Sequence, residues 1–398
     1  MYSDLAILAA FAFVYSVIAG RLEKTPLNGA IIFVTFGLAC GPIGLGIIDL
    51  DIDAEGIRTL AELTLALVLF TDAANADLRV LKLSFQVPQR LLLIGLPLTI
   101  LLGFVFGVLV FDQLSLLEVA LLATILAPTD AALGKAVVTN DAVPVRTREG
   151  LNVESGLNDG ICVPVLFVFL AFAAGSAGEA EPTSLILHEF ATEIGIGAGV
   201  GFVCILLGAF LFRVAHRRGW IGEIWIQVIA PAAAMTCFAT AQFLGGSGFI
   251  ACFLGGLFGG ALMREHKKDL LRAAEGTGDT LALLTWVTFG AVVASSAIEY
   301  FAWDALVYAI LSLTIIRMLP VFFVLTRMGL SVSDKLFLGW FGPRGLASIV
   351  FIVIVLNENL PGGETLKQTV VWTVILSIIA HGLTANPLAA LYGARQKK

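Results

Sequence analysis

Apolar runs long enough to cross a lipid bilayer alternate with short polar connections along the whole chain. A bilayer core about 30 Å thick requires roughly 20 apolar residues in a helix. Thirteen runs meet this requirement, some of them as two half-runs joined at a break. They cover residues 5–20, 27–44, 57–76, 91–111, 115–139, 148–174, 184–212, 222–244, 247–263, 275–297, 301–326, 334–356 and 367–392. The pattern predicts an all-α polytopic membrane protein with about 13 transmembrane helices.

The composition agrees with this pattern. Of the 398 residues, 58% are hydrophobic and 14% are charged, and the mean hydropathy is +0.95, which excludes a soluble globular protein. The first run has no positively charged start and no small-residue cleavage site, so we interpret it as a retained span. We expect the lipid bilayer to be the main partner of the chain, and we expect no nucleic-acid partner.

Cofactor chemistry has little support in the sequence. The five cysteines lie in apolar runs without a CxxC pair, and the four histidines lack the spacing of zinc ligands. No Walker motif is present, and the small residues of 245–260, GGSGFIACFLGGLFGG, recur at the spacing typical of close helix packing. We therefore expect neither a cofactor nor an enzymatic activity.

The basic residues indicate the orientation in the membrane. Twenty of the 24 Lys and Arg residues follow odd-numbered runs, whereas the connections after even-numbered runs hold only Arg58 and Lys367. By the positive-inside rule, the N-terminus is outside and the C-terminus is in the cytoplasm, which requires an odd number of spans. The remaining two, Arg317 and Arg344, lie within spans.

Interruptions occur at matching places in the two halves of the chain. Pro128 removes a helical donor and clashes with the preceding turn, so the helix should break over 127–130 and resume at Ala131. FGPRG at 341–345 interrupts the twelfth run, seven runs after the one that contains Pro128. HGLTANP at 381–387 interrupts the thirteenth run, seven runs after the one that contains NVESGLNDG. Such paired interruptions predict two inverted repeats with interrupted, crossing helices and a binding site at the repeat interface.

Oxygen-bearing side chains gather beside the first break. Glu154, Ser155, Asn158 and Asp159 occupy positions i, i+1, i+4 and i+5 of one helix, which places them on a common face. Thr129 lies at the break, where its carbonyl and hydroxyl are available. Oxygen ligands beside a broken helix predict a site for a hard monovalent cation, centred on Asp159. One carboxylate holds either a proton or a cation, and this competition couples the two fluxes.

Other charged residues within spans receive separate interpretations. We expect Asp130 to neutralise the positive N-terminus of the half-helix that follows the break. We expect Glu154 and Arg344 to form a buried ion pair that ties the two repeats together, because an unpaired charge is costly there. Arg317 pairs either with a carboxylate or with carbonyls at a break. Asp72 follows an uninterrupted apolar run and is expected at the cytoplasmic entrance to the cation site.

Several of these stretches resemble a known family. APTD at 127–130, NVESGLNDG at 152–160, IIRMLPV at 315–321 and FGPRGLAS at 341–348 are similar to motifs of the NhaP branch of the monovalent cation/proton antiporters, relatives of the eukaryotic sodium/proton exchangers. The resemblance covers essentially the whole chain. It implies thirteen helices in two inverted repeats, a homodimer in a prokaryotic inner (cell) membrane, and exchange of Na⁺ or Li⁺, sometimes K⁺, for H⁺ by an elevator-like movement.

The resemblance also implies roles for individual residues. Glu154 and Arg344 match the glutamate–arginine ion pair of the family. The positions that match its cation-binding residues are Asp159, Asn158, Ser155, Thr129 and, where many members carry an acidic residue, Asp72.

The same resemblance implies how the chain is divided. Residues 1–398 form one membrane transporter unit. Helices of 57–174 and 275–392 belong to the core (transport) domain, and those of 5–56 and 184–263 belong mainly to the dimerisation or scaffold part.

The leading hypothesis is an electroneutral Na⁺ (or Li⁺)/H⁺ antiporter with alternating access at a single aspartate, because Asn158 stands where a second carboxylate could be. A K⁺/H⁺ antiporter is the alternative, and a bile-acid-type organic anion symporter shares the repeat plan but not ESGLND. An intramembrane aspartyl protease needs a GxGD-like motif, which neither Asp130 nor Asp159 has. A channel is a further alternative.

Overall fold

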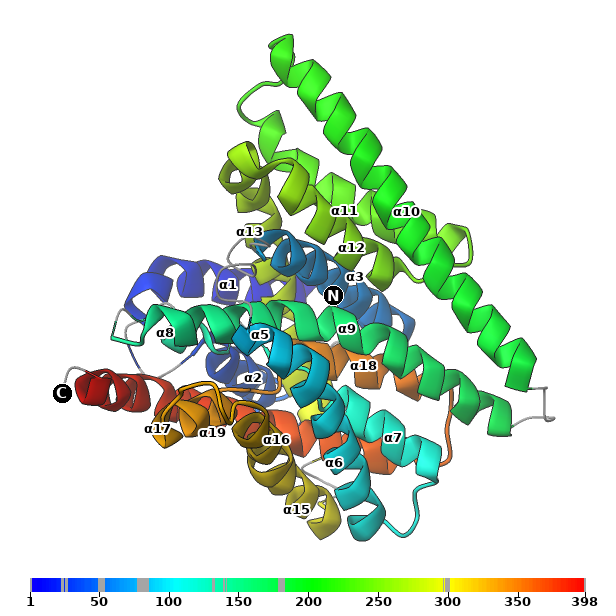
Figure 1. Ribbon diagram of the computed structural model, residues 1–398, viewed down its shortest axis with the longest axis vertical. Coiled ribbons are helices and arrows are strands. Elements are labelled where there is room, and N and C mark those ends of the chain that lie inside the picture. The colour runs from blue at the N-terminus through cyan, green and yellow to red at the C-terminus, as the bar shows by residue number, and fades with distance from the viewer. Residues whose placement is uncertain are drawn as a thin grey trace. The chain divides into compact units, whose positions relative to one another are not determined.

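The computed structural model describes residues 2–22, 25, 28–48, 54–76, 86–130, 133–138, 140, 142–177, 183–295, 297 and 301–396. Every regular element within these residues is a helix (Figure 1), so the predicted all-α architecture is confirmed. Eight of the described helices are long and apolar enough to cross a membrane, and four shorter apolar helices accompany them. The number of thirteen spans stays a prediction.

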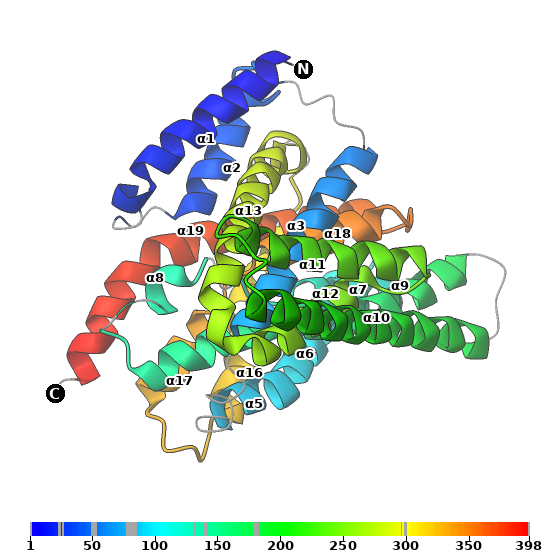
Figure 2. The ribbon, with the colours of Figure 1, turned by 90° about the horizontal axis from the view of Figure 1, so that it is seen from above.

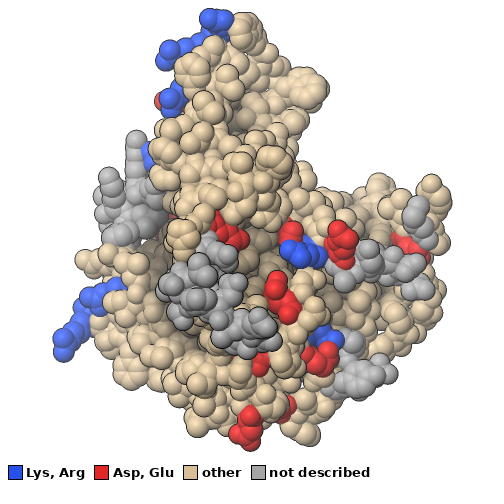
Figure 3. Space-filling view, turned by 90° about the vertical axis from the view of Figure 1, so that its right-hand side faces the viewer, with Lys and Arg blue, Asp and Glu red and all other residues tan. Residues whose placement is uncertain are grey.

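Much of the surface is apolar, as a lipid-facing surface must be. On the face shown in Figure 3, most side chains are neither basic nor acidic. Large apolar side chains such as Phe13 and Phe243 are exposed by 71% and 88%. In a water-soluble protein such exposure would be costly, but in hydrocarbon it is not.

Contacts divide the chain into two compact units, which are described separately. Unit 1 consists of Met1–Ala61, Ser84–Ser155 and Ala282–Lys398, and unit 2 consists of Glu62–Leu83 and Gly156–Leu281. Three of the described helices contribute residues to both units. They are α3 (Ala54–Asn75), α9 (Val145–Ala177) and α13 (Lys267–Thr288).

Unit 1 holds both interrupted spans. Its further helices are α1 (Tyr2–Leu22), α2 (Gly29–Cys40), α5 (Gln86–Arg90), η1 (Leu91–Gly95), α6 (Leu96–Val110), α7 (Leu116–Ile125), α8 (Lys135–Val138), η3 (Phe289–Ala294), α15 (Trp303–Leu311), η4 (Ser312–Ile316), α16 (Arg317–Val324), α17 (Val332–Trp340), α18 (Leu346–Leu356) and α19 (Gly363–Gln396). α1 lies alongside α2 (Figure 2), where the rings of Phe11 and Phe36 stack with centroids 3.8 Å apart. The elements η1, η3 and η4 are π-helical turns within longer helices, a feature that the apolar pattern does not reveal.

Unit 2 is built mainly from the middle of the chain. Its further helices are α10 (Thr183–Arg217), α11 (Trp225–Phe243), α12 (Gly248–Leu262) and the short 3₁₀ turn η2 (Arg264–His266). α10, α11 and α12 pack against one another in pairs.

The order of elements in unit 1 repeats. α7, a break, α8 and α9 are followed later by α17, a break, α18 and α19. Both series begin with a capping box, in which Ser115 pairs with Glu118 and Ser331 pairs with Asp334. Each acidic residue also accepts a hydrogen bond from α19 or the residue before it, since Gly362 N–H donates to Glu118 at 2.6 Å and Tyr392 O–H donates to Asp334 at 2.6 Å. The two series are therefore anchored to α19 by equivalent residues.

Both main interruptions are where the sequence predicts them. The break over 127–130 is confirmed, because α7 ends at Ile125 and the described residues contain no helix between it and α8. Ala131, where the helix was predicted to resume, lies outside the described residues. The break at 341–345 is confirmed as well, since it separates α17 from α18.

The predicted interruption at 381–387 is wrong. α19 runs without a break from Gly363 to Gln396 and keeps Pro387 inside it. A single proline removes one backbone donor, and a transmembrane helix tolerates this when neighbouring groups satisfy the freed carbonyl. A complete break leaves several donors and acceptors unpaired at each new helix end, so it persists only where other side chains pair with them.

Glycines bring α12 and α3 into backbone contact within unit 2. Gly256 and Gly260 are one turn apart and therefore lie on the same face of α12. They approach Phe70 and Ala74 of α3 so closely that an added Cβ atom would collide with the carbonyl oxygens of these two residues. The close helix packing predicted for 245–260 is confirmed.

We expect Gly256→Ala to destabilise the protein by about 1–3 kcal/mol, because the added methyl group must push α3 away from α12. Gly276→Ala is the matched control: Gly276 is an exposed glycine in α13 with no atom within 4 Å of an added Cβ. This control should gain about 0.4–1 kcal/mol. Thermal unfolding in detergent measures both, and equal midpoints for the two variants would contradict the packing argument.

Candidate cation-binding site

Asp130, at the end of the first break, is hydrogen-bonded to the helix that follows the second break. Its Oδ2 accepts the N–H of Leu346, the first residue of α18, at 2.9 Å, and its Oδ1 accepts the N–H of Leu133 at 3.1 Å. Its own N–H donates to the carbonyl of Pro343 at 2.8 Å. The sequence predicts that Asp130 compensates the helix after its own break; in the structure its carboxylate also lies at the positive N-terminus of α18.

Arg344, in the second break, is bound to the carbonyls of the first. Its guanidinium is fully buried, and Nη1 donates to the carbonyl oxygens of Ala127 at 2.6 Å and Pro128 at 3.0 Å. These residues follow the C-terminus of α7, where helix carbonyls lack partners and the dipole is negative. Ser348 of α18 donates to a further carbonyl there, that of Ile125, at 2.8 Å.

Each of the two breaks thus supplies the charge that compensates a helix end at the other break. The acidic residue of the first break compensates the helix that starts at the second, and the basic residue of the second compensates the helix that ends at the first. Gly345 leaves space for the Asp130 carboxylate, because a Cβ atom at position 345 would collide with it. The N-terminus of α18 and the C-terminus of α7 are therefore each paired with a charge of the opposite sign.

Glu154 of α9 forms a bidentate ion pair with Arg317 at the start of α16. Nη1 and Nη2 of Arg317 donate to Oε1 and Oε2 of Glu154 at 2.6 Å and 2.8 Å, and both residues are 1% exposed. The expectation that Glu154 pairs with Arg344 is therefore wrong. Of the two partners considered for Arg317, a carboxylate or carbonyls at a break, the structure shows the carboxylate, that of Glu154.

A physical reason explains why the sequence did not reveal the correct arginine. The π-helical turn η4 ends immediately before Arg317, and such a turn adds a residue and so changes the face that the next residue presents. Gly342 lies beside the guanidinium and leaves it space, since a Cβ atom there would overlap Nε of Arg317. Two parallel donors satisfy both carboxylate oxygens of Glu154, whereas Arg344 is occupied with carbonyls of the first break.

Two hydroxyl groups meet at the first break. The Oγ1 of Thr129 and the Oγ of Ser155 are 2.9 Å apart, and both residues are buried. Thr129 comes from the non-helical residues after α7 and Ser155 comes from α9, so the break brings a loop hydroxyl onto the polar face of α9. These two neutral oxygen atoms are of the kind that bind hard cations.

Asn158 and Asp159 follow Ser155 by one helical turn of α9. Both are buried, with exposed fractions of 0% and 7%. The continuous helix confirms the register in which they share a face with Glu154 and Ser155. The polar face of α9 that holds Glu154 therefore carries a second carboxylate, that of Asp159, next to an amide and a hydroxyl.

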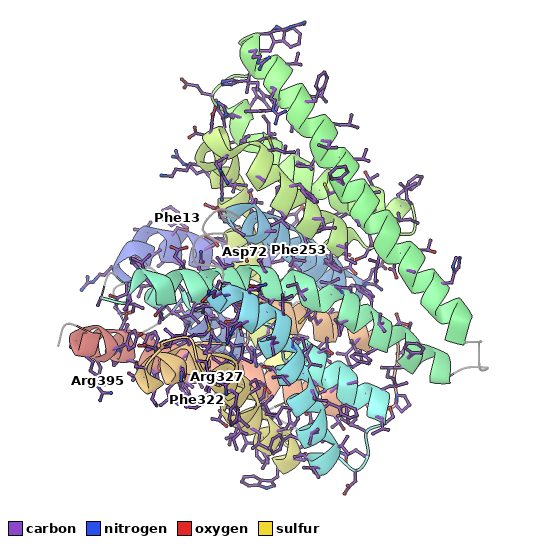
Figure 4. All side chains as sticks on the ribbon, viewed as in Figure 1. Phe13, Asp72, Phe253, Phe322, Arg327 and Arg395 are labelled. Atoms are coloured by element: carbon purple, nitrogen blue, oxygen red, sulfur yellow. The ribbon has the colours of Figure 1, made fainter. Side chains whose placement is uncertain are left out.

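Asp72 lies in unit 2 near the end of α3 and is partly buried (Figure 4). Its backbone carbonyl packs against α9 at Gly156, where an added Cβ atom would be 3.5 Å from the Asp72 oxygen. Gly156 is three residues before Asp159, so the structure brings Asp72 to the turn of α9 that bears the candidate ligands.

Ser377 and His381 of α19 were not among the predicted site residues, yet they hold the second break. The Oγ of Ser377 accepts the N–H of Arg344 at 2.7 Å, and Nε2 of His381 is 2.8 Å from the carbonyl oxygen of Trp340, the last residue of α17. Nδ1 of His381 is 3.2 Å from the Ser377 hydroxyl. A histidine and a serine one turn apart in an apolar span are the sequence signal that could have identified them.

Comparison with known proteins gives a consistent picture. Residues 7–391 match the family described as Sodium/hydrogen exchanger, transmembrane. The K(+)/H(+) antiporter NhaP2 of Shewanella sp. (strain ANA-3) is 24% identical over 387 residues, 97% of this chain and 66% of that protein. The Na(+)/H(+) antiporter of Schizosaccharomyces pombe (strain 972 / ATCC 24843) is 23% identical over 72% of this chain and 67% of that protein. The chain thus spans about two thirds of the length of these curated relatives.

A solved structure shares the fold. The sodium proton antiporter MjNhaP1 from Methanocaldococcus jannaschii at pH 8 superposes with a TM-score of 0.79, covers 95% of this chain and 98% of that chain, and is 22% identical. At this identity, the similarity establishes the fold.

We expect Glu154→Gln and Arg317→Gln each to destabilise the protein by about 3–5 kcal/mol, because each leaves a buried charge without its partner. The double variant should cost clearly less than the sum of the two. The matched comparison is Glu154→Gln combined with Arg344→Gln, whose effects should add. Thermal stability in detergent is the measurement, and a strong coupling of Glu154 to Arg344 in place of Arg317 would contradict the pairing.

Proposed function

Because the chain belongs to the sodium/hydrogen exchanger family, we propose that it is a secondary active antiporter that exchanges Na⁺ or Li⁺ for H⁺. Asp159 is the carboxylate that carries either ion, and Asn158, Ser155, Thr129 and Asp72 contribute oxygen atoms around it or at its entrance. Alternating access of this one site to the two sides of the membrane moves the two ions in opposite directions.

The observation that carries the proposal is the arrangement along α9. Of the two carboxylates on its polar face, that of Glu154 is neutralised by Arg317. The hydroxyls of Thr129 and Ser155 meet at 2.9 Å one turn before Asp159. A single carboxylate that lies close to uncharged oxygen atoms has the right charge for one monovalent cation or one proton at a time.

K⁺ is the second candidate cation. The relative from Shewanella is named a K(+)/H(+) antiporter, and the relative from Schizosaccharomyces pombe is named a Na(+)/H(+) antiporter. Sealed vesicles with an imposed pH gradient, to which Li⁺, Na⁺, K⁺ and Rb⁺ are added in turn, distinguish the two. Dissipation of the gradient by Li⁺ and Na⁺ supports the first proposal, and dissipation by K⁺ and Rb⁺ supports the second.

Orientation and assembly complete the proposal. The N-terminus lies outside and the C-terminus in the cytoplasm of a prokaryotic inner (cell) membrane, as the basic connections indicate. Two copies form a homodimer, in which helices of 57–174 and 275–392 form the core domain and those of 5–56 and 184–263 the dimerisation part. The homodimer and its division into core and dimerisation parts rest on the family resemblance.

We expect Asp159→Asn to abolish exchange while leaving the fold intact, because the amide has nearly the same volume but cannot alternate between a proton and a cation. The control is Glu149→Gln, which makes the same chemical change at a partly exposed position of α9 and should keep the wild-type rate. Exchange in reconstituted vesicles and thermal stability in detergent are measured together. Exchange by Asp159→Asn near the wild-type rate would refute Asp159 as the carrier.

We also expect electroneutral exchange, with one proton moved per cation. Asp130 accepts backbone hydrogen bonds on both carboxylate oxygens at a helix N-terminus, which favours its staying ionised throughout the cycle. Rates in proteoliposomes should therefore be the same with and without a valinomycin-clamped potential. A clear acceleration by a favourable potential would mean that a second proton carrier, such as Asp72, takes part.

A further inference from the structure

Two histidines meet at one end of unit 2, on elements other than α9. His216 lies in the last turn of α10, and His266 ends the 3₁₀ turn η2 between α12 and α13. Their Nε2 atoms are 3.2 Å apart. They are 50 positions apart in the sequence, so only the folded structure brings them together.

Phe212, one turn before His216, positions both imidazole rings. Its ring stacks on that of His216 with centroids 5.6 Å apart and meets the edge of that of His266 at 5.3 Å. The two imidazole rings are themselves 4.4 Å apart at an angle of 68°. His216 is exposed and His266 is partly exposed, so solvent and small ions reach the pair.

The separation of the two nitrogen atoms fits one metal ion. Zinc binds imidazole nitrogen at about 2.0–2.1 Å with tetrahedral angles, which places two such nitrogen atoms about 3.3 Å apart. We propose that His216 and His266 form a binding site for a divalent transition metal ion of the kind that prefers imidazole, such as Zn²⁺. Water completes the coordination, because the described residues contain no group of three or more His, Cys, Asp or Glu side chains that could hold a metal.

The surrounding charges set the affinity of this two-histidine site. Basic residues flank it along the chain, and two of them are bound to carbonyls: Arg213 donates to Leu262 O at 3.3 Å and Lys267 donates to Asn75 O at 2.9 Å. Their positive charge weakens the binding of a cation, and two protein ligands bind less tightly than four. We therefore expect an affinity in the micromolar range or weaker, well below that of structural zinc sites.

The proposed site is chemically distinct from the one on α9. Imidazole nitrogen atoms select transition metals, whereas carboxylate, hydroxyl and carbonyl oxygen atoms select hard cations such as Na⁺. A bound metal ion would connect the end of α10 to the turn between α12 and α13, within unit 2. Without a metal ion the two Nε2 atoms lie within hydrogen-bonding distance of each other.

The test uses the full-length protein in detergent, freed of any polyhistidine tag, with Zn²⁺ as the probe. Titration in competition with a chromophoric zinc indicator at neutral pH should show one ion bound per chain. His216→Asn and His266→Asn should each weaken binding by roughly tenfold or more. The matched control is His188→Asn, which alters an exposed histidine near the other end of α10 and should leave binding unchanged.

A second measurement identifies the ligands directly. The electron paramagnetic resonance spectrum of bound Cu²⁺ should show coupling to two imidazole nitrogen atoms in the wild type and to one in either single variant. Binding should weaken as the pH falls, because protons compete for the same nitrogen atoms. Absence of binding at millimolar Zn²⁺, or equal affinity in the wild type and both single variants, would overturn the proposal.

Discussion

The mutual compensation of helix ends between the two breaks is the interaction on which the candidate site depends. A buried helix end leaves backbone donors or acceptors without partners, and such groups are costly to remove from water. The Asp130 carboxylate supplies the anion that α18 requires at its N-terminus, and the Arg344 guanidinium supplies the cation that the carbonyls after α7 require. Without these two side chains, the break that Pro128 favours would bury two helix ends without compensating charges.

The last helix, α19, holds the rest of this framework together. Glu118 accepts a backbone N–H just before its start, and Tyr392 near its end donates to Asp334. Between these two points, Ser377 and His381 bind the second break. α19 thus contacts the start of both interrupted spans and one of the two interruptions through hydrogen bonds whose geometry is specific. Apolar packing alone would hold these helices together without fixing their register.

In the proposed mechanism, the charges that stabilise the fold differ in role from the charge that binds the transported ions, that of Asp159. Glu154 and Arg317 satisfy each other with two hydrogen bonds, and Asp130 is bound to two backbone donors. Carboxylates held in this way have both oxygen atoms already engaged in the fold. A carboxylate that exchanges a proton for a cation needs an environment in which both forms are tolerated, and neutral oxygen atoms provide it. The two carboxylates on this face of α9 therefore have different roles: Glu154 stabilises the fold, and Asp159 carries the transported ions.

The sequence by itself determined the helical class, the polar face of α9 and the two places where helices break. Each of these depends on local information: the length of apolar runs, the helical period, and proline or glycine next to a charged residue. Only the tertiary structure decided which arginine pairs with Glu154, because a π-helical turn and the space beside Gly342 set the direction of Arg317. The same holds for the continuity of α19 and for the approach of His216 to His266. A pairing between distant residues depends on the register and rotation of both helices, and a single amino-acid sequence does not encode these in any local pattern.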